Sequence, residues 1–182
     1  MRIVGGQYKG LRVQMPKAGT IRPTTDRARE GLFNILSHRY VIEGANVLDL
    51  FGGSGIVSME FASRHAANIA CVEKDRRVST AIMNELKRLN IPDVIVKTAE
   101  ALKFLERCNE QFDIIFADPP YHLPLVSSLS EKIRQAGILK ENGIFILEHE
   151  ANVVPSPTNM IEQRNYGQSV FSFYSYGESE LD

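Results

Sequence analysis

Short continuous runs of apolar residues alternate with amphipathic segments along most of this 182-residue chain. The runs have the length and β-branched content of strands buried on both faces. The segments between them repeat apolar residues at helical spacing, as Val78, Ile82 and Leu86 do. Strands are predicted at residues 47–51, 69–73, 94–97, 112–118 and 143–148, and helices at about 56–64, 76–89, 101–108 and 125–135. Because the two alternate, the pattern predicts an α/β fold with a doubly wound, mostly parallel sheet.

The two ends of the chain depart from this alternation. Residues 2–4 and 11–13 are short β-prone runs with glycine turn signals between them, which predicts a small β-hairpin. Too few residues are available there for a second core, so residues 1–20 are interpreted as an appendage to a domain of residues 21–182. Near the other end, residues 166–174 predict one or two further strands without an intervening helix, and hence an antiparallel edge.

A further amphipathic helix is predicted between the hairpin and the first strand of the sheet. Thr24, Thr25 and Asp26 can each cap its amino end, and apolar residues follow at helical spacing to residue 36. Gly31 is a poor helix former, so we expect another part of the chain to pack closely against it.

Composition restricts the class of protein. Apolar residues make up 43% of the chain, which is enough for one sizeable core. Cys71 and Cys108 fit no metal-binding spacing, so no metal is expected, and Cys71 lies in a strand pattern typical of the core. No apolar run approaches the length of a membrane span, and the first residues lack the apolar region of a signal peptide. These features predict a protein of the reducing cytoplasm.

Charge is unevenly distributed along the chain. Residues 1–39 hold eight Lys or Arg and two Asp or Glu, a net of +6, whereas residues 40–182 carry a net of −7. A basic arm on an acidic body favours a polyanionic partner such as nucleic acid, although a solvated basic face would give the same count. The candidate contacts are Arg2, Lys9, Arg12, Arg22, Arg27 and Arg29. The alternative for the arginines is a set of solvated or salt-bridged side chains, such as Arg27 with Glu30.

A glycine-rich turn, Gly52-Gly53-Ser54-Gly55, directly follows the first predicted strand and opens a helix. Such turns let a ligand approach the backbone and meet free N–H groups at the helix start. A dinucleotide fingerprint would need a third glycine where Ser58 stands, and Asp49 would repel a pyrophosphate. An anionic site instead suits a ligand that carries an ammonium and a sulfonium, as S-adenosylmethionine does.

Two further acids follow neighbouring predicted strands. Glu73 ends the second strand, where a carboxylate can accept hydrogen bonds from both ribose hydroxyls. Glu100 follows the third strand and is placed to accept from an adenine amine or to order its loop. Either acid could instead be a solvated strand-end or helix-start carboxylate. Because the carboxyl ends of parallel strands share one edge, the acids together favour a nucleotide-like cofactor.

The fourth predicted strand ends in Asp118-Pro119-Pro120-Tyr121. Prolines cannot donate ladder hydrogen bonds, so the strand stops there and leaves a rigid turn. An exocyclic amine of a nucleobase could donate to Asp118 and to the Pro119 carbonyl oxygen while Tyr121 stacks on the ring. The alternative is an ordinary loop closed by two prolines. Of the four histidines only His122, beside this turn, merits a test, and a solvent-facing loop histidine is the simpler interpretation.

These motifs resemble the class I S-adenosylmethionine-dependent methyltransferases that act on amino groups and, more narrowly, the bacterial 16S ribosomal RNA guanine-N2 methyltransferase family. The resemblance covers almost the whole chain and is carried by residues 2–6, 22–24, 29–30, 32–36, 48–51, 53–55, 60, 63–64, 118–121 and 166–167. The chain departs from the family pattern at Gly52, where alanine is common, and at Ser58 and His65, where glycine is common.

The resemblance implies a seven-stranded Rossmann-like methyltransferase sheet with an N-terminal β-hairpin extension. It implies S-adenosylmethionine bound by Asp49, Phe51, Gly52, Gly53, Gly55, Glu73, Lys74, Glu100 and Asp118. Asp118, Pro119, Pro120 and Tyr121 would hold and activate the target guanine. The partner would be 16S ribosomal RNA, and the protein would act as a monomer. Two alternatives are a DNA adenine-N6 or protein glutamine methyltransferase, and a non-catalytic RNA-binding ribosome-assembly factor.

Overall fold

A single seven-stranded sheet forms the centre of the computed structural model, which describes residues 1–14, 24–120 and 125–177. The strand order is β3-β2-β1-β4-β5-β7-β6. The strands are β1 (Asn46–Asp49), β2 (Asn68–Glu73), β3 (Val94–Thr98), β4 (Phe112–Ala117), β5 (Leu139–Glu150), β6 (Met160–Tyr166) and β7 (Ser169–Tyr174). Strands β1 to β5 pair in parallel, and β7 lies antiparallel between β5 and β6, which confirms the predicted antiparallel edge.

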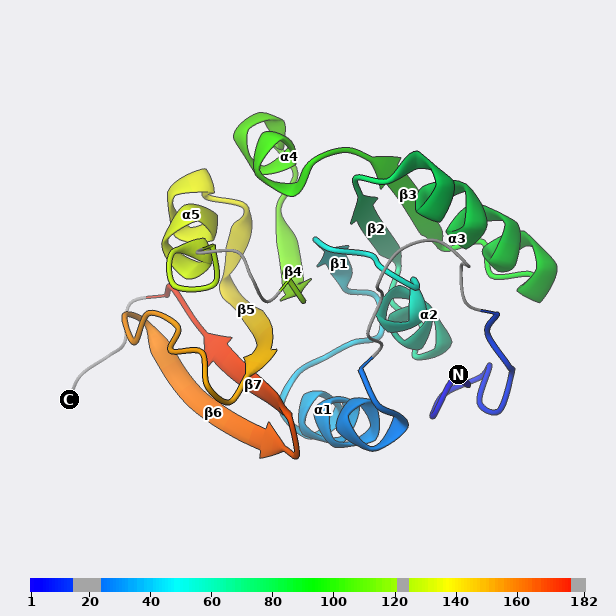
Figure 1. The fold of residues 1–182 in the computed structure, drawn as a ribbon, viewed down its shortest axis with the longest axis horizontal. Helices are drawn as coiled ribbons and strands as arrows, with labels where there is room; N and C mark the ends of the chain where they lie inside the picture. Colours follow the sequence, from blue (N-terminus) through cyan, green and yellow to red (C-terminus); the bar gives the residue numbers. More distant parts are fainter. Residues whose placement is uncertain (15–23, 121–124, 178–182) are drawn as a thin grey trace.

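Helices cover both faces of the sheet, as a doubly wound fold requires (Figure 1). They are α1 (Asp26–Arg39), α2 (Ile56–Ser63), α3 (Arg76–Leu89), α4 (Ala101–Arg107) and α5 (Leu129–Ala136). Apolar side chains of α1, α2 and α3 share one core cluster, and those of α4 and α5 share the cluster on the other face. Among the helices of the described residues, none is long and apolar enough to cross a membrane.

Helix α5 begins at Leu129 instead of residue 125, and two strands begin earlier than the pattern predicts. Strand β6 begins at Met160, well before the predicted residue 166. The pattern missed these residues because their side chains are mostly polar and exposed and give no apolar alternation. Strand β5 begins at Leu139 instead of residue 143. The pattern missed its start because residues 140–142 are polar and partly exposed. Both differences concern solvated strand segments, where burial does not select apolar residues.

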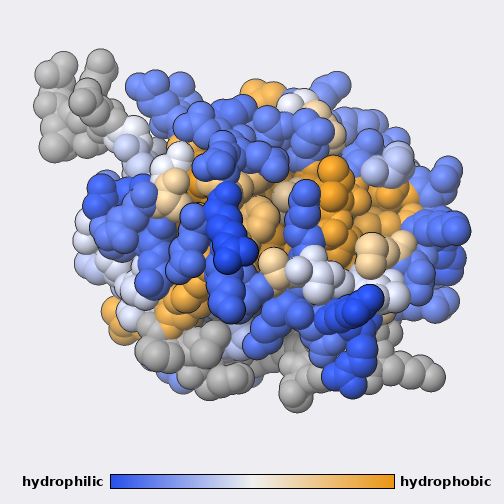
Figure 2. Space-filling view, turned by 90° about the horizontal axis from the view of Figure 1, so that it is seen from above, coloured by the Kyte–Doolittle hydropathy of each residue, from blue (hydrophilic) through white to orange (hydrophobic). Residues whose placement is uncertain are grey.

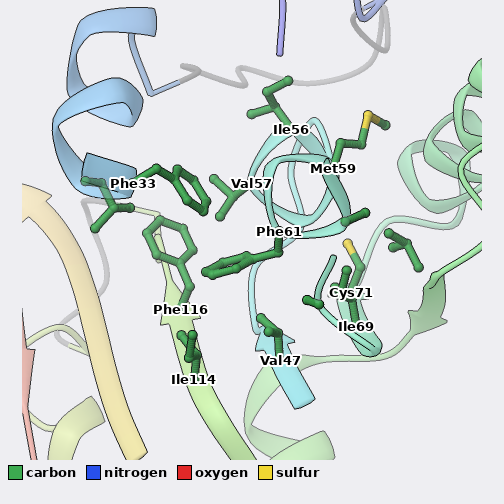
Figure 3. Packing of buried hydrophobic residues seen from close by; sticks show 14 of the residues in the cluster. Phe33, Val47, Ile56, Val57, Met59, Phe61, Ile69, Cys71, Ile114 and Phe116 are labelled. Atoms are coloured by element: carbon green, nitrogen blue, oxygen red, sulfur yellow. The ribbon is translucent and has the colours of Figure 1, made fainter. Parts of the chain in front are cut away.

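Aromatic packing holds α2 against the sheet. Phe33 of α1 and Phe61 of α2 meet edge to face with ring centroids 4.8 Å apart. Figure 3 shows these rings beside Phe116 of β4 and Val57 of α2. All eight residues of α2 are buried, so the helix and the loop that precedes it are fixed between α1 and the sheet.

The N-terminal arm, residues 1–14, forms the small antiparallel pairing that the sequence predicts. Arg2 and Arg12 form an isolated bridge, and the Ile3 N–H donates to the Leu11 carbonyl oxygen at 3.0 Å. The arm has no core of its own, because Ile3 and Val13 are buried in the cluster beneath α1, α2 and α3.

The amino-terminal helix also fits its sequence signals. Thr25 is the N-cap of α1, and its side chain accepts from the Ala28 N–H. A Cβ on Gly31 would lie 2.2 Å from the Tyr166 ring, so the expected close approach is made by β6.

Over the side of the molecule on which α4 lies, polar residues surround a central region where apolar residues gather (Figure 2).

Candidate functional site

The parallel strands bring the acids predicted from the sequence to one edge of the sheet. Asp49 ends β1 and pairs in register with Cys71 of β2 and with Phe116 of β4. A pocket at this edge is lined by Asp49, by residues 51–54 of the β1–α2 loop, and by Asp118 after β4. The structure therefore places the glycine turn and two of the predicted carboxylates around one cavity.

Asp49 is the most deeply buried acid of this pocket, with 1% of its surface exposed. Its Oδ2 accepts a hydrogen bond from the Ser58 hydroxyl at 2.7 Å. Its Oδ1 has no hydrogen-bond partner among the described residues. Burial raises the pKa of this carboxyl to about 6, and the bonds from Ser58 oppose that rise. A buried oxygen without a donor is the feature expected where a cationic ligand supplies one.

The glycine turn is packed directly against β2. A Cβ on Gly52 would lie 2.6 Å from the Cys71 sulfur, so this position and Cys71 are matched in size. Gly55 is the N-cap of α2 and adopts a left-handed conformation that glycine reaches without strain. The N–H groups of the turn are used within the protein, since Gly52 donates to the Val72 carbonyl oxygen at 2.8 Å and Gly55 to the Gly52 carbonyl oxygen at 2.7 Å. The free N–H groups expected from the sequence are therefore not found at these two positions, and the turn contributes close approach of a ligand to the backbone.

Glu73 ties the glycine turn to the end of β2. Its Oε2 accepts from the Gly53 N–H at 3.0 Å, and its Oε1 accepts from the Asp75 N–H at 2.8 Å. The carboxylate is half-buried, so it retains acceptor capacity beside the pocket. Lys74, the next residue, is exposed.

Glu100 lies farther from this pocket and has a structural task. It is the N-cap of α4, and its side chain accepts from the Lys103 N–H at 3.0 Å. This is the loop-ordering alternative considered for Glu100, and a contact with adenine stays a prediction.

The Asp118-Pro119-Pro120 turn follows β4, which ends at Ala117. Asp118 lines the same pocket as Asp49, Pro119 is buried and Pro120 is half-buried. Tyr121 and His122 lie outside the described residues, so the predicted stacking platform and the histidine beside it stay predictions.

Thr24 and Glu148 also belong to this region, although the sequence predicts Thr24 only as a possible helix cap and Glu148 only as the end of a strand. Thr24 lines the pocket, and its hydroxyl donates to Glu148 Oε2 at 2.6 Å. Glu148 is 1% exposed and follows Leu147 of β5, which pairs with Ala117, the residue before Asp118. The signal for Glu148 was present, because it closes a predicted strand as Glu73 does.

The basic residues of the arm and α1 divide into two groups. Lys9, Arg12 and Arg27 are exposed. Arg2 is largely exposed and its Nε lies 3.3 Å from Asp26 Oδ2. Arg22 lies outside the described residues.

Arg29 corrects the prediction of an RNA contact. Its side chain is completely buried, and it donates to the Thr24 and Arg2 carbonyl oxygens at 2.6 and 2.7 Å. It also pairs with Asp26 at 2.8 Å and with buried Glu60 at 3.3 Å. Because these donors are used inside the protein, Arg29 joins the arm, α1 and α2 and is not available to RNA.

No metal site accompanies these residues. Within the described ranges, no group of three or more His, Cys, Asp or Glu side chains is placed to hold a metal ion. Cys71 is buried, and burial raises the pKa of its thiol well above the usual value.

The strand order and the acidic, glycine-lined pocket at the ends of β1 and β4 define a Rossmann-like methyltransferase. A family model described as "Conserved hypothetical protein 95" matches residues 1–175. The chain belongs to this family.

Its relatives include ribosomal RNA methyltransferases. Ribosomal RNA small subunit methyltransferase D of Escherichia coli K12 is 33% identical over 189 residues, which cover 100% of this chain and 94% of the relative. The solved structure of yhhF from Escherichia coli, described provisionally as a methyltransferase, superposes with a TM-score of 0.84 at 33% identity and covers 97% of this chain and 98% of that one. A hypothetical protein of Thermus thermophilus gives a TM-score of 0.86 at 27% identity, with 97% and 99% covered. These matches confirm the family resemblance that the motifs indicated.

Proposed function

We propose that this protein is an S-adenosylmethionine-dependent methyltransferase that modifies the exocyclic N2 amine of a guanine in small-subunit ribosomal RNA. The observation that carries the proposal is the Asp49 oxygen, buried and without a donor among the described residues, beside a glycine turn and Asp118. The methyltransferase relatives support the reaction class, and the name of the Escherichia coli relative supports the RNA substrate.

The pocket fits the cofactor in its donor set. Asp49 Oδ1 suits the ammonium group, and the backbone of Phe51, Gly52 and Gly53 suits a ligand that approaches the chain closely. Gly55 would support this loop as the N-cap of α2. Glu73 and Lys74 would lie beside the ribose, and Glu100 nearer the adenine. When bound, the cofactor supplies an electrophilic methyl group.

The residues after β4 would orient the target amine. A guanine amine is a poor nucleophile because its lone pair is delocalised into the ring. Hydrogen bonds to Asp118 and to the Pro119 carbonyl oxygen would favour the attacking geometry. Pro120 keeps the turn rigid, and Tyr121 would stack on the flipped base.

The exposed basic residues of the arm and α1 suit an RNA backbone. Arg2, Lys9, Arg12 and Arg27 are exposed on these two segments, and Arg22 belongs to the same basic stretch of the sequence. We expect a monomer that acts in the cytoplasm on 16S ribosomal RNA within a small subunit or an assembly intermediate.

The decisive experiment measures methyl transfer from radiolabelled cofactor to naked 16S ribosomal RNA, to small subunits, to DNA and to protein. Nuclease digestion and mass spectrometry of the product identify the modified base. We expect N2-methylguanosine from small-subunit ribosomal RNA. N6-methyladenine in DNA or methylglutamine in protein would replace the proposal with the first alternative, and cofactor-independent RNA binding without transfer would replace it with the second.

A further inference from the structure

Helix α2 is buried along its whole length, and the serine in its first turn is enclosed with it. Ser58 has no exposed surface, and its hydroxyl donates to Asp49 Oδ2 at 2.7 Å. A helical serine commonly returns its hydroxyl to the carbonyl one turn earlier. Here the hydroxyl instead reaches a carboxylate on the neighbouring strand, so it connects α2 to the acid of the pocket.

The bond from the Ser58 hydroxyl, beside one from the Ser58 backbone, makes the two Asp49 oxygens different. Oδ2 is held by Ser58, whereas Oδ1 is buried and has no hydrogen-bond partner among the described residues. Asp49 lines the pocket, but Ser58 does not, so the hydroxyl bonds the carboxylate from outside the pocket. A carboxylate held on one oxygen cannot rotate freely, and the other oxygen keeps a fixed direction.

We propose that Ser58 is a positioning residue for cofactor binding, because its hydroxyl holds the Asp49 carboxylate so that Oδ1 remains available to the ammonium group of the ligand. The inference rests on the proposed function, since it assumes that Asp49 contacts the cofactor. It concerns a position where this chain departs from the family pattern, in which glycine is common. The hydroxyl is therefore not required for cofactor binding, and its removal should weaken binding without abolishing it.

The surroundings of Asp49 make a hydroxyl donor valuable. The other titratable groups that face it or line its pocket are Cys71 and Glu73 of β2 and Asp118 after β4. Glu148 of β5 is bonded to Thr24, which lines the same pocket. In the part of the chain that the structure describes, no lysine or arginine lines this pocket. The Ser58 hydroxyl lowers the pKa of Asp49, which burial raises to about 6. Without it, a larger share of Asp49 would be protonated near neutral pH and unable to pair with a cation.

The test measures affinity by calorimetry for two ligands between pH 5.5 and 8.5. S-adenosylhomocysteine carries the ammonium group, and methylthioadenosine keeps the adenosine part without the amino acid. The variants are Ser58→Ala and Ser58→Gly, of which the second replaces the serine with the residue common in the family and guards against a folding failure. Ser63→Ala is the matched control, because Ser63 is an equally buried serine of α2 whose hydroxyl donates to the Gly5 carbonyl oxygen in the arm. Asp49→Asn tests the assumption that Asp49 contacts the cofactor.

We expect both Ser58 variants to bind S-adenosylhomocysteine about tenfold more weakly at pH 7, as loss of one hydrogen bond to a charged group predicts. The pH below which affinity falls should move upward, while methylthioadenosine affinity and the Ser63→Ala protein stay unchanged. Equal losses for both ligands would indicate general damage and overturn the inference. Unchanged binding by the Ser58 variants, with weakened binding by Asp49→Asn, would overturn the inference but keep the site. Unchanged binding by Asp49→Asn would remove Asp49 from the site and the inference with it.

Discussion

Asp49 illustrates how a buried charge can oppose the fold. Its carboxylate is buried without a basic partner among the described residues that line the pocket, and burial raises its pKa to about 6 from an ordinary value of 3.8. A carboxyl whose pKa is raised by folding opposes folding at pH values above its folded pKa. That cost disappears as the pH falls through about 6 toward the unfolded value. This cost to the fold is consistent with the cofactor contact proposed for Asp49.

Asp49→Asn should make the free protein more stable at pH 7.5, because it removes an uncompensated buried charge. The gain in free energy of unfolding should be about 1–3 kcal/mol, as a shift of one or two pKa units implies. It should shrink at pH 4.5, where Asp49 is already protonated in the folded protein. Thermal unfolding at both pH values, without cofactor, measures this difference. A variant that is less stable at pH 7.5 would contradict the argument.

Although Asp118 lines the proposed cofactor pocket, its variant should affect mainly turnover, because Asp49 and Glu73 stay intact. Asp118→Asn keeps the shape of the side chain but replaces one acceptor with a donor that would face the hydrogens of the amine. Single-turnover methylation should fall by roughly 10²–10³, and cofactor affinity should stay within a few-fold. Asp93→Asn, at the opposite edge of the sheet just before β3, is the control and should change neither. Near-normal turnover by Asp118→Asn would show that the turn of residues 118–120 is an ordinary loop with no role in catalysis.

Among the elements, α1 and α2 show why neighbouring arginines can have opposite roles. Arg27 and Arg29 lie two positions apart on α1, yet Arg27 is exposed and Arg29 is buried against Glu60. Glu60 in turn accepts from the Val4 N–H at 2.8 Å and pairs with Arg64 at 2.7 Å. The buried cluster thus holds α1, α2 and the arm together.

Arg29→Ala should lower the free energy of unfolding by about 3–5 kcal/mol, since it leaves part of a buried ion pair without its partner. Arg27→Ala is the matched control and should change stability by no more than about 0.5 kcal/mol, while weakening RNA binding. Urea denaturation followed by circular dichroism gives the stabilities. Equal stability of the two variants would show that the Arg29 cluster contributes little to the fold.

The elements also show how far the sequence allows prediction. Apolar periodicity located every helix and the buried strands, because burial on one or both faces selects those residues. It missed most of β6, whose exposed side chains are under no such selection. The distribution of charge made Arg29 a candidate RNA contact, with a salt-bridged side chain as the alternative, because a count of charges carries no information about burial. The bonds from Thr24 to Glu148 and from Ser58 to Asp49 join separate elements, so only the folded chain reveals them.

One departure from the family pattern has a plain backbone explanation. His65 adopts a φ of +65°, in the left-handed region that favours glycine. Glycine would reach this conformation without strain, which accounts for its frequency at this position in the family.

At the scale of the whole molecule, charge separates one part of the chain from the rest. Residues 1–39 carry the basic excess, and residues 40–182 carry the acidic excess. Counterion release makes contacts between such an arm and RNA depend on salt.

The double variant Lys9→Glu, Arg12→Glu should bind 16S ribosomal RNA more weakly and with a flatter dependence on salt concentration. Lys103→Glu, Lys132→Glu is the control with the same change of net charge, made on α4 and α5 away from the arm. Filter binding at several salt concentrations measures both slopes. If the two double variants behave alike, the arm does not contact RNA.

The hydrogen bonds that anchor the arm also bear on the order in which parts of the chain fold. Backbone N–H groups of Val4, Tyr8 and Gln14 donate to side chains of Glu60, Ser63 and Glu85, which lie 56, 55 and 71 positions later. During synthesis these first residues leave the ribosome long before their partners, and loop closure over such distances is slow. We expect the segment made first to be completed late, after α2 and α3 are in place. Pulse-labelled hydrogen exchange during refolding would detect this as late protection of the Val4 and Tyr8 amides, and early protection would contradict it.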